Sequence, residues 1–592
     1  MKPSKTSKLP KLARLLKVPK FSVEQIKAWW SKFKMTPSRR ALALLLGFIA
    51  TALIPNFILA NTEMYGGWSI LAGILIPLGF YMVVGSAIRR TGTPVLLMVW
   101  VMVLCAFQIV LLFLYGGSII GTDMFLNLFT TNPGESTELL INLGDAVATV
   151  VVIYAPVLGY AIWASRRRYR ITKKMRKRFV ISGLVIGVVG GLMLIPARVS
   201  SGESVFLREV FPANVLYNLK LCLSTQIHTK RYETTSEGFT HKATRCDNPD
   251  QRQIYIYIIG EASRAANWQL YGYDRSTTPR LSAREDIIPF YNVLTQSNTT
   301  HKSVPLFLSS VGAKNHSEIY RRKGLASLFS EAGFKTYFIS NQSPQGAMVD
   351  RLANEADERV YIGSPRHDMQ LLKMVKRIID SDNGRDLLFI LHTYGSHYSY
   401  HQRYPREYAY FMPDDDVALK DYNIEYIMNS YDNSIYYTDA VLNEIIDYVG
   451  SLDNVCASLL YCSDHGEDIL DDKRERFLHA SPTVTYYQVH VPSLVWFSES
   501  YAARYPERVA RAKSNTWSPM TTYSMFHTIA EIASIESPYL DPTVSFVGEK
   551  FDCNAKRYYL NDHNEAVPFD LQHVGLNEDD LRSFERHGIT NL

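Results

Sequence analysis

Long apolar runs dominate the first third of the chain. Five of them lie at roughly 41–60, 67–87, 94–115, 145–164 and 179–196, and they contain almost no charged residue. A helix that crosses a bilayer needs about 20 such residues. Buried helices of a soluble core are the alternative, but five runs in succession favour a membrane domain of five transmembrane helices over residues 41–196.

A different pattern begins near Gln251. Short β-forming runs at 254–259, 335–339, 387–392, 457–462 and 493–497 alternate with helical patterns near 321–332, 366–381, 430–448 and 519–534. This alternation predicts a mostly parallel sheet with helices on both faces, which is an α/β domain over residues 251–592. Residues 197–250 are interpreted as a connector that is partly helical and amphipathic.

Charge is distributed unevenly along the chain. The formal net charge is +6, yet the first 178 residues alone hold about 23 Lys/Arg against about 6 Asp/Glu, so the remainder is acidic. Basic residues fall in the tail 1–40, at 89–90 and at 166–178, while 61–66 and 116–144 contain none. The positive-inside rule then predicts a cytoplasmic N-terminus. An odd number of spans puts residues after about 197 on the opposite side, which is the periplasm in a bacterium. Two compartments explain this asymmetry better than nucleic-acid binding does.

The tail itself has two interpretations. It is either a solvated segment or an anchor at an anionic membrane surface. Its basic region is too long for a cleavable signal, and no small-residue cleavage site follows it.

The six cysteines argue against two kinds of site. None forms a C-x-x-C pair, so a thiolate zinc site or a dense disulfide scaffold is not expected. Cys222 and Cys246 are a candidate disulfide if this region is oxidising.

Metal-type ligands follow three of the predicted strands. Glu261 comes directly after the strand at 254–259, and Asp464-His465 follows the one at 457–462. His392 and His397 follow the third, and His479 lies shortly beyond Asp464. Any one of these residues is more often structural, but the carboxyl ends of parallel strands meet at one edge of a sheet. Carboxylates and imidazoles without thiolates suit catalytic zinc, with manganese as the lesser alternative.

A nucleophile is expected in the segment 295–305, which follows the Glu261 strand. It offers several hydroxyls at a predicted helix N-terminus, among them Thr299, Thr300 and Ser303, and composition does not choose between them. An ordinary polar loop is the alternative. The C-x-P-x-R motif that sulfatases need is absent here. A hydroxyl becomes a strong nucleophile when a base or a metal lowers its pKa.

The first external loop, 116–144, has a helical repeat of polar residues. Asn127, Thr131 and Glu135 lie four residues apart, which places them on one helix face, and Pro133-Gly134 suggests two short helices. This face is either a solvated amphipathic surface or a grip for a lipid headgroup.

Four separated motifs resemble those of the membrane phosphoethanolamine transferases that modify bacterial lipopolysaccharide. The motifs are Gly260-Glu-Ala-Ser-Arg264 with Tyr271 to Pro279, Thr300-His-Lys-Ser-Val-Pro305, Ser463-Asp-His-Gly-Glu467 and His490-Val-Pro492. That family belongs to the alkaline phosphatase/sulfatase superfamily, and the resemblance covers almost the whole chain, five spans included.

The resemblance implies roles for the candidate residues. Thr300, three positions before Ser-Val-Pro, would be the nucleophile. Zinc would be held by Glu261, Asp464, His465 and the Thr300 oxygen. One zinc ion is expected, and a second is conceivable. Residues implied to contact the transferred phosphate, a second zinc or the substrate are His397, His479, Gln342, Asn127, Thr131 and Glu135.

The implied reaction is a double displacement in the bacterial inner membrane. Phosphatidylethanolamine would donate its headgroup to Thr300, releasing diacylglycerol, and the group would pass to lipopolysaccharide (core or lipid A) or to a periplasmic glycan. Alternatives are a phosphoglycerol transferase, a phosphodiesterase or sulfatase-like hydrolase, and a non-catalytic membrane assembly protein.

The chain departs from the lipid A enzymes at four positions. Gln296 and Leu306 stand where those enzymes have cysteines, and Gln342 and Gln345 stand where the family has Asn and Lys. These differences look more like the branch that acts on core sugars or periplasmic glucans.

Overall fold

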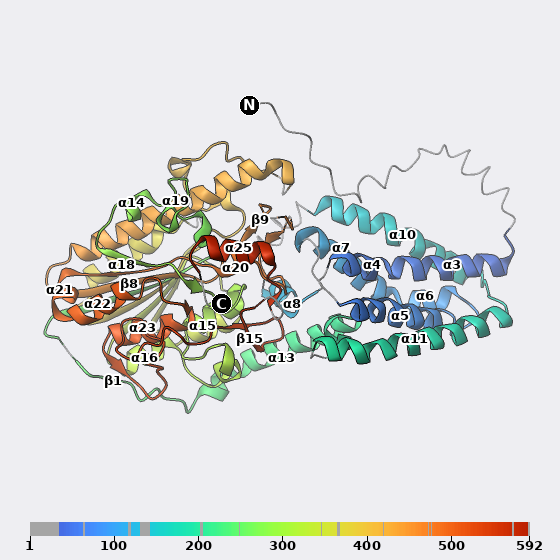
Figure 1. The fold of residues 1–592 in the computed structure, drawn as a ribbon, viewed down its shortest axis with the longest axis horizontal. Helices are drawn as coiled ribbons and strands as arrows, with labels where there is room; N and C mark the ends of the chain where they lie inside the picture. Colours follow the sequence, from blue (N-terminus) through green and yellow to red (C-terminus); the bar gives the residue numbers. More distant parts are fainter. Residues whose placement is uncertain are drawn as a thin grey trace.

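The protein consists of a helical bundle and an α/β domain that lie end to end (Figure 1). The computed structural model describes residues 35–62, 66–115, 120–130, 143–201, 205–247, 249–344, 346–363, 367–417, 420–471, 473–474, 476–570, 574–589 and 592. The bundle holds α3 (Pro37–Ala52), α4 (Ile54–Thr62), α5 (Gly67–Gly85), α6 (Gly92–Leu97), α7 (Val99–Tyr115), α10 (Gly144–Arg166) and α11 (Lys173–Ser201).

Every one of the five predicted apolar segments is helical. Within the described residues, four helical stretches are long and apolar enough to cross a membrane: Pro37–Asn61, which comprises α3 and most of α4, Gly67–Gly85, Gly144–Arg166 and Lys173–Val199. The third predicted segment differs, because it is divided at Met98 into α6 and α7, and its apolar helix Val99–Leu112 is shorter. The Met98 N–H donates to the carbonyls of Pro94 and Val95, which closes α6 before α7 begins.

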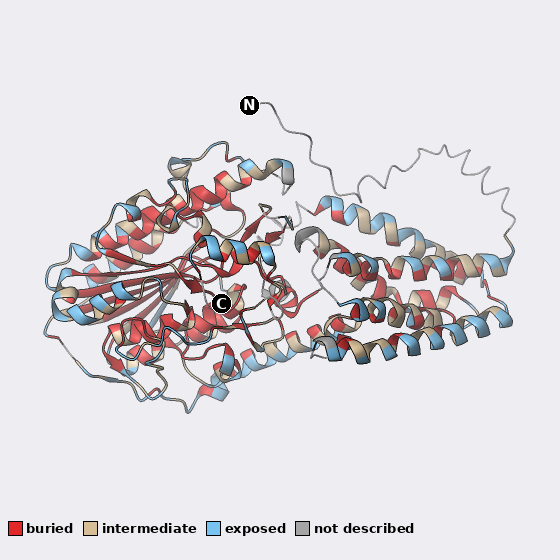
Figure 2. Ribbon diagram, in the orientation of Figure 1, coloured by how far each residue is buried: buried red, intermediate tan, exposed pale blue. Residues whose placement is uncertain are grey.

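The outer faces of α10 and α11 are apolar. Val151 and Val152 of α10 are 55% and 67% exposed, and Val188 and Ile195 of α11 are 62% and 63% exposed. Figure 2 shows exposed residues along both helices. A continuous apolar surface of this kind is unfavourable in water and suits contact with lipid.

Basic segments meet at one end of the bundle. Arg90 pairs with Arg170 in an antiparallel bridge, and the Arg40 guanidinium donates to the Tyr169 hydroxyl at 2.8 Å. This end, where α3 begins, lies away from the α/β domain (Figure 1). Arg40, Arg90 and Arg170 therefore lie at the same end of the bundle.

The α/β domain is built on a seven-stranded sheet in the order β3-β11-β8-β2-β7-β5-β6. The strands are β2 (Arg252–Gly260), β3 (Ile287–Phe290), β5 (Lys335–Ser340), β6 (Glu358–Tyr361), β7 (Leu387–His392), β8 (Val455–Ser463) and β11 (Ser493–Phe497). β11 is antiparallel to both its neighbours, and the other pairings are parallel, so the prediction of a mostly parallel sheet is confirmed.

Helices cover both faces of this sheet because its central strands are apolar on both sides. Ile254, Ile256 and Ile258 of β2 belong to one core with α18 (Met369–Ser381) and α19 (Ile424–Gly450). Tyr255 and Tyr257 belong to the other core. That second core is covered by α15 (Thr300–Phe307), α16 (Leu325–Glu331), α17 (Met348–Ala353) and α23 (Tyr523–Ile532). The four predicted helices correspond to α16, α18, α19 and α23.

Two helices join the parts. α13 (Ala213–Ser236) runs from the bundle along the α/β domain, and α8 (Thr122–Thr130) lies between the two parts (Figure 1). The candidate disulfide is not formed: Cys222, buried in α13, and Cys246, exposed after β1 (Thr244–Arg245), are both free thiols. The predicted Cys222–Cys246 disulfide is therefore wrong. Sequence spacing does not show whether two Cβ atoms approach within disulfide distance.

Candidate active site

Two adjacent strands deliver the first carboxylates. Gly260 at the end of β2 is paired with Ser463 at the end of β8, so Glu261 and Asp464 leave the sheet side by side. The Asp464 N–H donates to the Gly260 carbonyl at 2.9 Å, and Asp464 Oδ1 accepts from the backbone N–H groups of Ala262 and His465 at 3.1 and 2.7 Å. These bonds fix Oδ1 of the Asp464 carboxylate and leave Oδ2 directed into the site.

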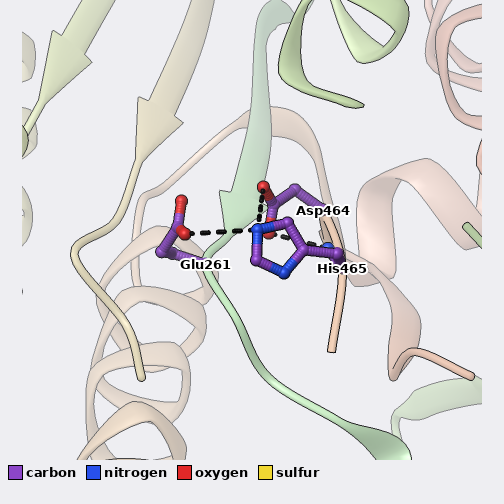
Figure 3. Close-up of side chains that lie close together, drawn as sticks. All are labelled: Glu261, Asp464 and His465. Atoms are coloured by element: carbon purple, nitrogen blue, oxygen red, sulfur yellow. Dashed lines mark hydrogen bonds and ion pairs between the residues drawn. The ribbon is translucent and has the colours of Figure 1, made fainter. Parts of the chain in front are cut away.

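The Nε2 atom of His465 faces the carboxylates of both Glu261 and Asp464 (Figure 3). Its Nε2 lies 3.5 Å from Glu261 Oε1 and 3.4 Å from Asp464 Oδ2, and all three side chains are fully buried. One ligand atom from each residue lies within 4.8 Å of the other two. Among the described residues this is the cluster of His, Cys, Asp and Glu side chains whose spacing suits a metal ion.

The protonation of this cluster is strongly biased. Burial, followed by the nearby His479, lowers the pKa of His465 to about 3, which leaves a neutral imidazole. Burial raises the pKa of Asp464 well above its usual value, and the Glu261 charge raises it further. Burial also acts to raise the pKa of Glu261, but the histidines around it lower that pKa below its usual value. Two neighbouring carboxyl groups thus share this buried site, and the charge of Glu261 disfavours ionisation of Asp464.

Zinc fits this donor set. Two carboxylates and one neutral imidazole are ligands that zinc accepts, and a dication would offset the charge of two buried carboxylates. Glu261, Asp464 and His465 would hold the ion. The resulting site has three protein side chains, which is typical of catalytic rather than structural zinc.

Thr300 stands at the first turn of α15 and faces the cluster. Its Oγ1 donates to Glu261 Oε1 at 3.0 Å and lies 3.1 Å from His465 Nε2. The other candidate hydroxyls have different partners. Thr299 contacts Ser297 at 3.3 Å, while Ser303 donates to Asp464 Oδ2 at 3.0 Å and to the Thr299 carbonyl. Ser303 therefore orients a carboxylate, and Thr300 is the hydroxyl beside both Glu261 and His465.

Gln342 and Asp368 support the site from the next strands. Gln342 Nε2 donates to Glu261 Oε2 at 2.8 Å and to the Thr393 carbonyl at 2.9 Å. The buried Asp368 carboxylate accepts from Asn341 Nδ2 at 2.7 Å and from the Gly395 N–H at 2.8 Å. It thereby joins the loops after β5 and β7. Sequence reasoning named Gln342 but missed Asp368, whose position at the start of α18 was the available signal.

Two further histidines lie at this edge of the sheet. The His479 ring centroid is 4.1 Å from that of His465, and His479 Nδ1 is 3.4 Å from both oxygens of the buried Glu467. His397 donates through Nδ1 to the Tyr398 carbonyl at 2.7 Å. Its charge acts on the pKa of both Glu261 and His465. Glu467 is a partner that sequence reasoning quoted but gave no role.

The lipid-loop candidates are placed only in part. Asn127 lies in α8, while Thr131, Glu135 and Gln345 lie outside the described residues. The structure adds a residue from the same loop that the sequence analysis missed. Asp123 of α8 lies 2.8 Å from Lys302 Nζ and 3.2 Å from His301 Nε2, next to Thr300 in α15.

Comparison with known proteins assigns the domain that carries these residues. Residues 253–535 match the sulfatase family model. This region, just under half of the chain, resembles the sulfatase family. It contains Glu261, Thr300, Asp464 and His465, so the whole cluster falls within the matched region.

Curated relatives match most of the chain. This protein is 27% identical over 416 residues to the Kdo(2)-lipid A phosphoethanolamine 7''-transferase of Salmonella typhimurium. The aligned region covers 65% of this chain and 72% of that protein. The integral membrane lipooligosaccharide phosphoethanolamine transferase A (EptA) of Neisseria meningitidis has the same fold. Its TM-score is 0.66 at 20% identity, over 85% of this chain and 98% of that one.

One similar domain of known structure contains zinc. The C-terminal periplasmic domain of EcEptC from Escherichia coli, crystallised in complex with Zn, is 25% identical with a TM-score of 0.50. It covers 56% of this chain and 98% of that one.

Proposed function

We propose that this protein transfers phosphoethanolamine from phosphatidylethanolamine to lipopolysaccharide or a periplasmic glycan. The observation that carries the proposal is the position of Thr300, whose Oγ1 lies 3.0 Å from Glu261 Oε1 and 3.1 Å from His465 Nε2. A hydroxyl that donates to a buried carboxylate at a helix N-terminus is suited to attack a phosphodiester. The names of the relatives support the transferred group, and the apolar helices support a lipid donor.

The proposed reaction has two displacements. In the first, Thr300 Oγ1 attacks the phosphorus of the lipid, its proton leaves toward Glu261, and the P–O bond to diacylglycerol breaks as that alcohol takes up a proton. In the second, an acceptor oxygen attacks the Thr300 phosphodiester, loses its proton, and Thr300 regains its hydroxyl. Catalysis of such a transfer consists mainly of positioning and of neutralising charge on the phosphoryl oxygens.

The residues around Thr300 match these needs. Bound zinc would lower the pKa of the Thr300 hydroxyl and offset phosphoryl charge. His397 and His479 are available to hold phosphoryl oxygens and to give a proton to the leaving alcohol. Gln342 keeps the Glu261 carboxylate in place. One zinc ion is proposed at Glu261, Asp464, His465 and Thr300. Glu467 and His479 are where a second ion would bind, and Mn²⁺ is the weaker choice.

We place the protein in a bacterial inner membrane, with a cytoplasmic N-terminus and a periplasmic catalytic domain. The basic segments at the far end of the bundle support this orientation. Asn127, Thr131 and Glu135 are proposed to bind the donor headgroup. Gln296 and Leu306, where cysteines are absent, favour the branch acting on core sugars or glucans over the lipid A branch.

The test is to trap the covalent intermediate. Purified full-length protein in detergent is incubated with phosphatidylethanolamine, and intact mass and peptide mapping are recorded. We expect one phosphoethanolamine group on Thr300, none in Thr300→Ala, and an unchanged result in Thr299→Ala, whose buried hydroxyl is the matched control. Label from phosphatidylglycerol instead would move the protein to the phosphoglycerol transferases. Headgroup released to water by the wild type without an acceptor dependence would make it a hydrolase.

A further inference from the structure

The loop helix α8 is fastened to the nucleophile helix by a buried ion pair. Asp123 Oδ1 is 2.8 Å from Lys302 Nζ, with side-chain exposures of 5% and 4%. His301 Nε2 lies 3.2 Å from the same oxygen and is 6% exposed. Asp123 belongs to the segment between two membrane helices, whereas His301 and Lys302 follow Thr300 directly in α15. The two parts of the protein therefore meet next to the proposed nucleophile.

A second carboxylate fixes the other end of this contact. Asp562 caps the N-terminus of α8, because its Oδ2 and Oδ1 accept from the N–H groups of Thr122 and Asp123 at 2.8 and 2.9 Å. Lys302 Nζ also donates to the Asn561 carbonyl at 3.0 Å. The Lys302 ammonium thus contacts both α8 and the turn that caps α8. A shift of α8 would therefore reach α15 through the contacts of Asp123 with Lys302 and His301, of which the Lys302 ion pair is the shorter.

We propose that Asp123 is a positioning residue that sets the orientation of Thr300 from the membrane side, acting through Lys302. This inference rests on the proposed function, because it assigns α8 the task of joining the lipid-binding loop to the nucleophile. Thr300 and Lys302 lie in the same helical turn, so a shift of Lys302 displaces Thr300 Oγ1 relative to Glu261 and His465. Small displacements of reacting atoms have large effects on rate.

A buried ion pair is a suitable device for this task. It adds little net stability relative to neutral side chains of similar size, but it holds one geometry, since breaking it leaves an uncompensated charge. The role of Asp123 in positioning is therefore separable from its role in stability. Asp123→Asn leaves the buried Lys302 ammonium without its counter-charge. Asp123→Asn combined with Lys302→Met removes both charges of the pair.

The experiment compares these variants in the full-length protein. Formation of the Thr300 adduct from phosphatidylethanolamine is followed by mass spectrometry to give kcat and KM for the first displacement, and the melting temperature is recorded in the same detergent. We expect Asp123→Asn to lower both the melting temperature and kcat. The double variant should regain the melting temperature, yet keep a kcat reduced by roughly tenfold to a hundredfold with KM little changed.

The matched control is an exposed ion pair that also joins the two parts. Lys420 Nζ lies 2.8 Å from Asp145 Oδ2, but this pair is exposed, with Asp145 at 77%. Asp145→Asn should leave kcat unchanged. Recovery of kcat together with stability in the double variant would overturn the inference and make Asp123 purely structural, as would wild-type kcat in Asp123→Asn. Failure of the proposed function is distinguishable, because wild-type protein would then form no adduct on Thr300.

Discussion

His465 donates through Nδ1 to the carbonyl of its neighbour Gly466 at 2.8 Å. A carbonyl only accepts, so the proton of the neutral imidazole is on Nδ1 and the lone pair is on Nε2. That nitrogen is the one that faces Thr300, Glu261 and Asp464. A backbone carbonyl in this position fixes both the tautomer and the orientation of a metal-binding histidine.

Replacing His465 by alanine is therefore expected to weaken zinc binding. The remaining Glu261 and Asp464 would share one buried site without a neutral ligand, and we expect zinc affinity to fall by at least roughly tenfold. Zinc content of the purified protein, measured by inductively coupled plasma mass spectrometry, tests this. His527→Gln is the control, since His527 is buried and accepts from the Asp541 N–H away from the site. Full zinc occupancy in His465→Ala would remove this residue from the ligand set.

Gln342→Ala is expected to weaken zinc binding without abolishing it. The change takes away the amide that donates to Glu261 Oε2 at 2.8 Å, so the carboxylate loses the group that orients it. Loss of such a partner typically costs ten- to a hundredfold in metal affinity or activity. Competition with a chelator measures the affinity. Gln253→Ala at the opposite end of β2 is the control, and an equal loss in both variants would show a general effect on the strand.

Much of this site follows from the sequence. The strand ends at Glu261 and Asp464 are predictable because buried β-forming runs stop at polar residues, and parallel strands bring their carboxyl ends together. The antiparallel direction of β11 and the strands β3 and β6 were not evident, since periodicity gives no strand direction and these edge strands are short. The break at Met98 was also missed, because 94–115 is uniformly apolar.

The contacts of Asp123, Asp368 and Glu467 were beyond sequence reasoning for a different reason. Asp123 lies 179 positions from Lys302, while Asp368 and Glu467 contact residues 27 and 12 positions away. Only the folded arrangement shows which partner each buried carboxyl group contacts. Thr300 was chosen among three hydroxyls through resemblance, whereas in the structure the contacts with Glu261 and His465 distinguish it.

Gly466→Ala is expected to distort the metal site through the backbone. A Cβ at this position would overlap the Tyr487 carbonyl oxygen and lie 3.0 Å from the Arg264 Cβ. Both obstacles are rigid, so the turn after His465 must move. We expect a loss of about 1–3 kcal/mol in the free energy of unfolding and reduced zinc content. Thermal unfolding and metal analysis check this. Gly238→Ala, where nothing lies within 4 Å of the new Cβ, should lose neither.

Glu355 is expected to make stability depend on pH. This carboxyl follows α17 and accepts from the Tyr232 hydroxyl of α13 and from the Gly324 N–H at 2.7 Å. Burial raises the pKa of Glu355 to about 7. In the unfolded chain the carboxyl group has the ordinary pKa of Glu, about 4.3. Between these pH values only the folded chain holds the proton, so the free energy of unfolding falls as pH rises through this interval.

With pKa values of about 7 in the folded chain and about 4.3 in the unfolded chain, the effect of Glu355 is at most about 4 kcal/mol, and it is complete at about pH 8. Glu355→Gln should flatten the dependence, because an amide keeps the size of the side chain, accepts from Gly324 and donates to Tyr232 without titrating. Melting temperatures of both proteins at about pH 5 and about pH 8 measure this, with the variant the more stable at the higher pH. Glu358→Gln on β6, whose side chain is 55% exposed, should retain the wild-type pH profile. An unchanged profile in Glu355→Gln would show that another group is responsible.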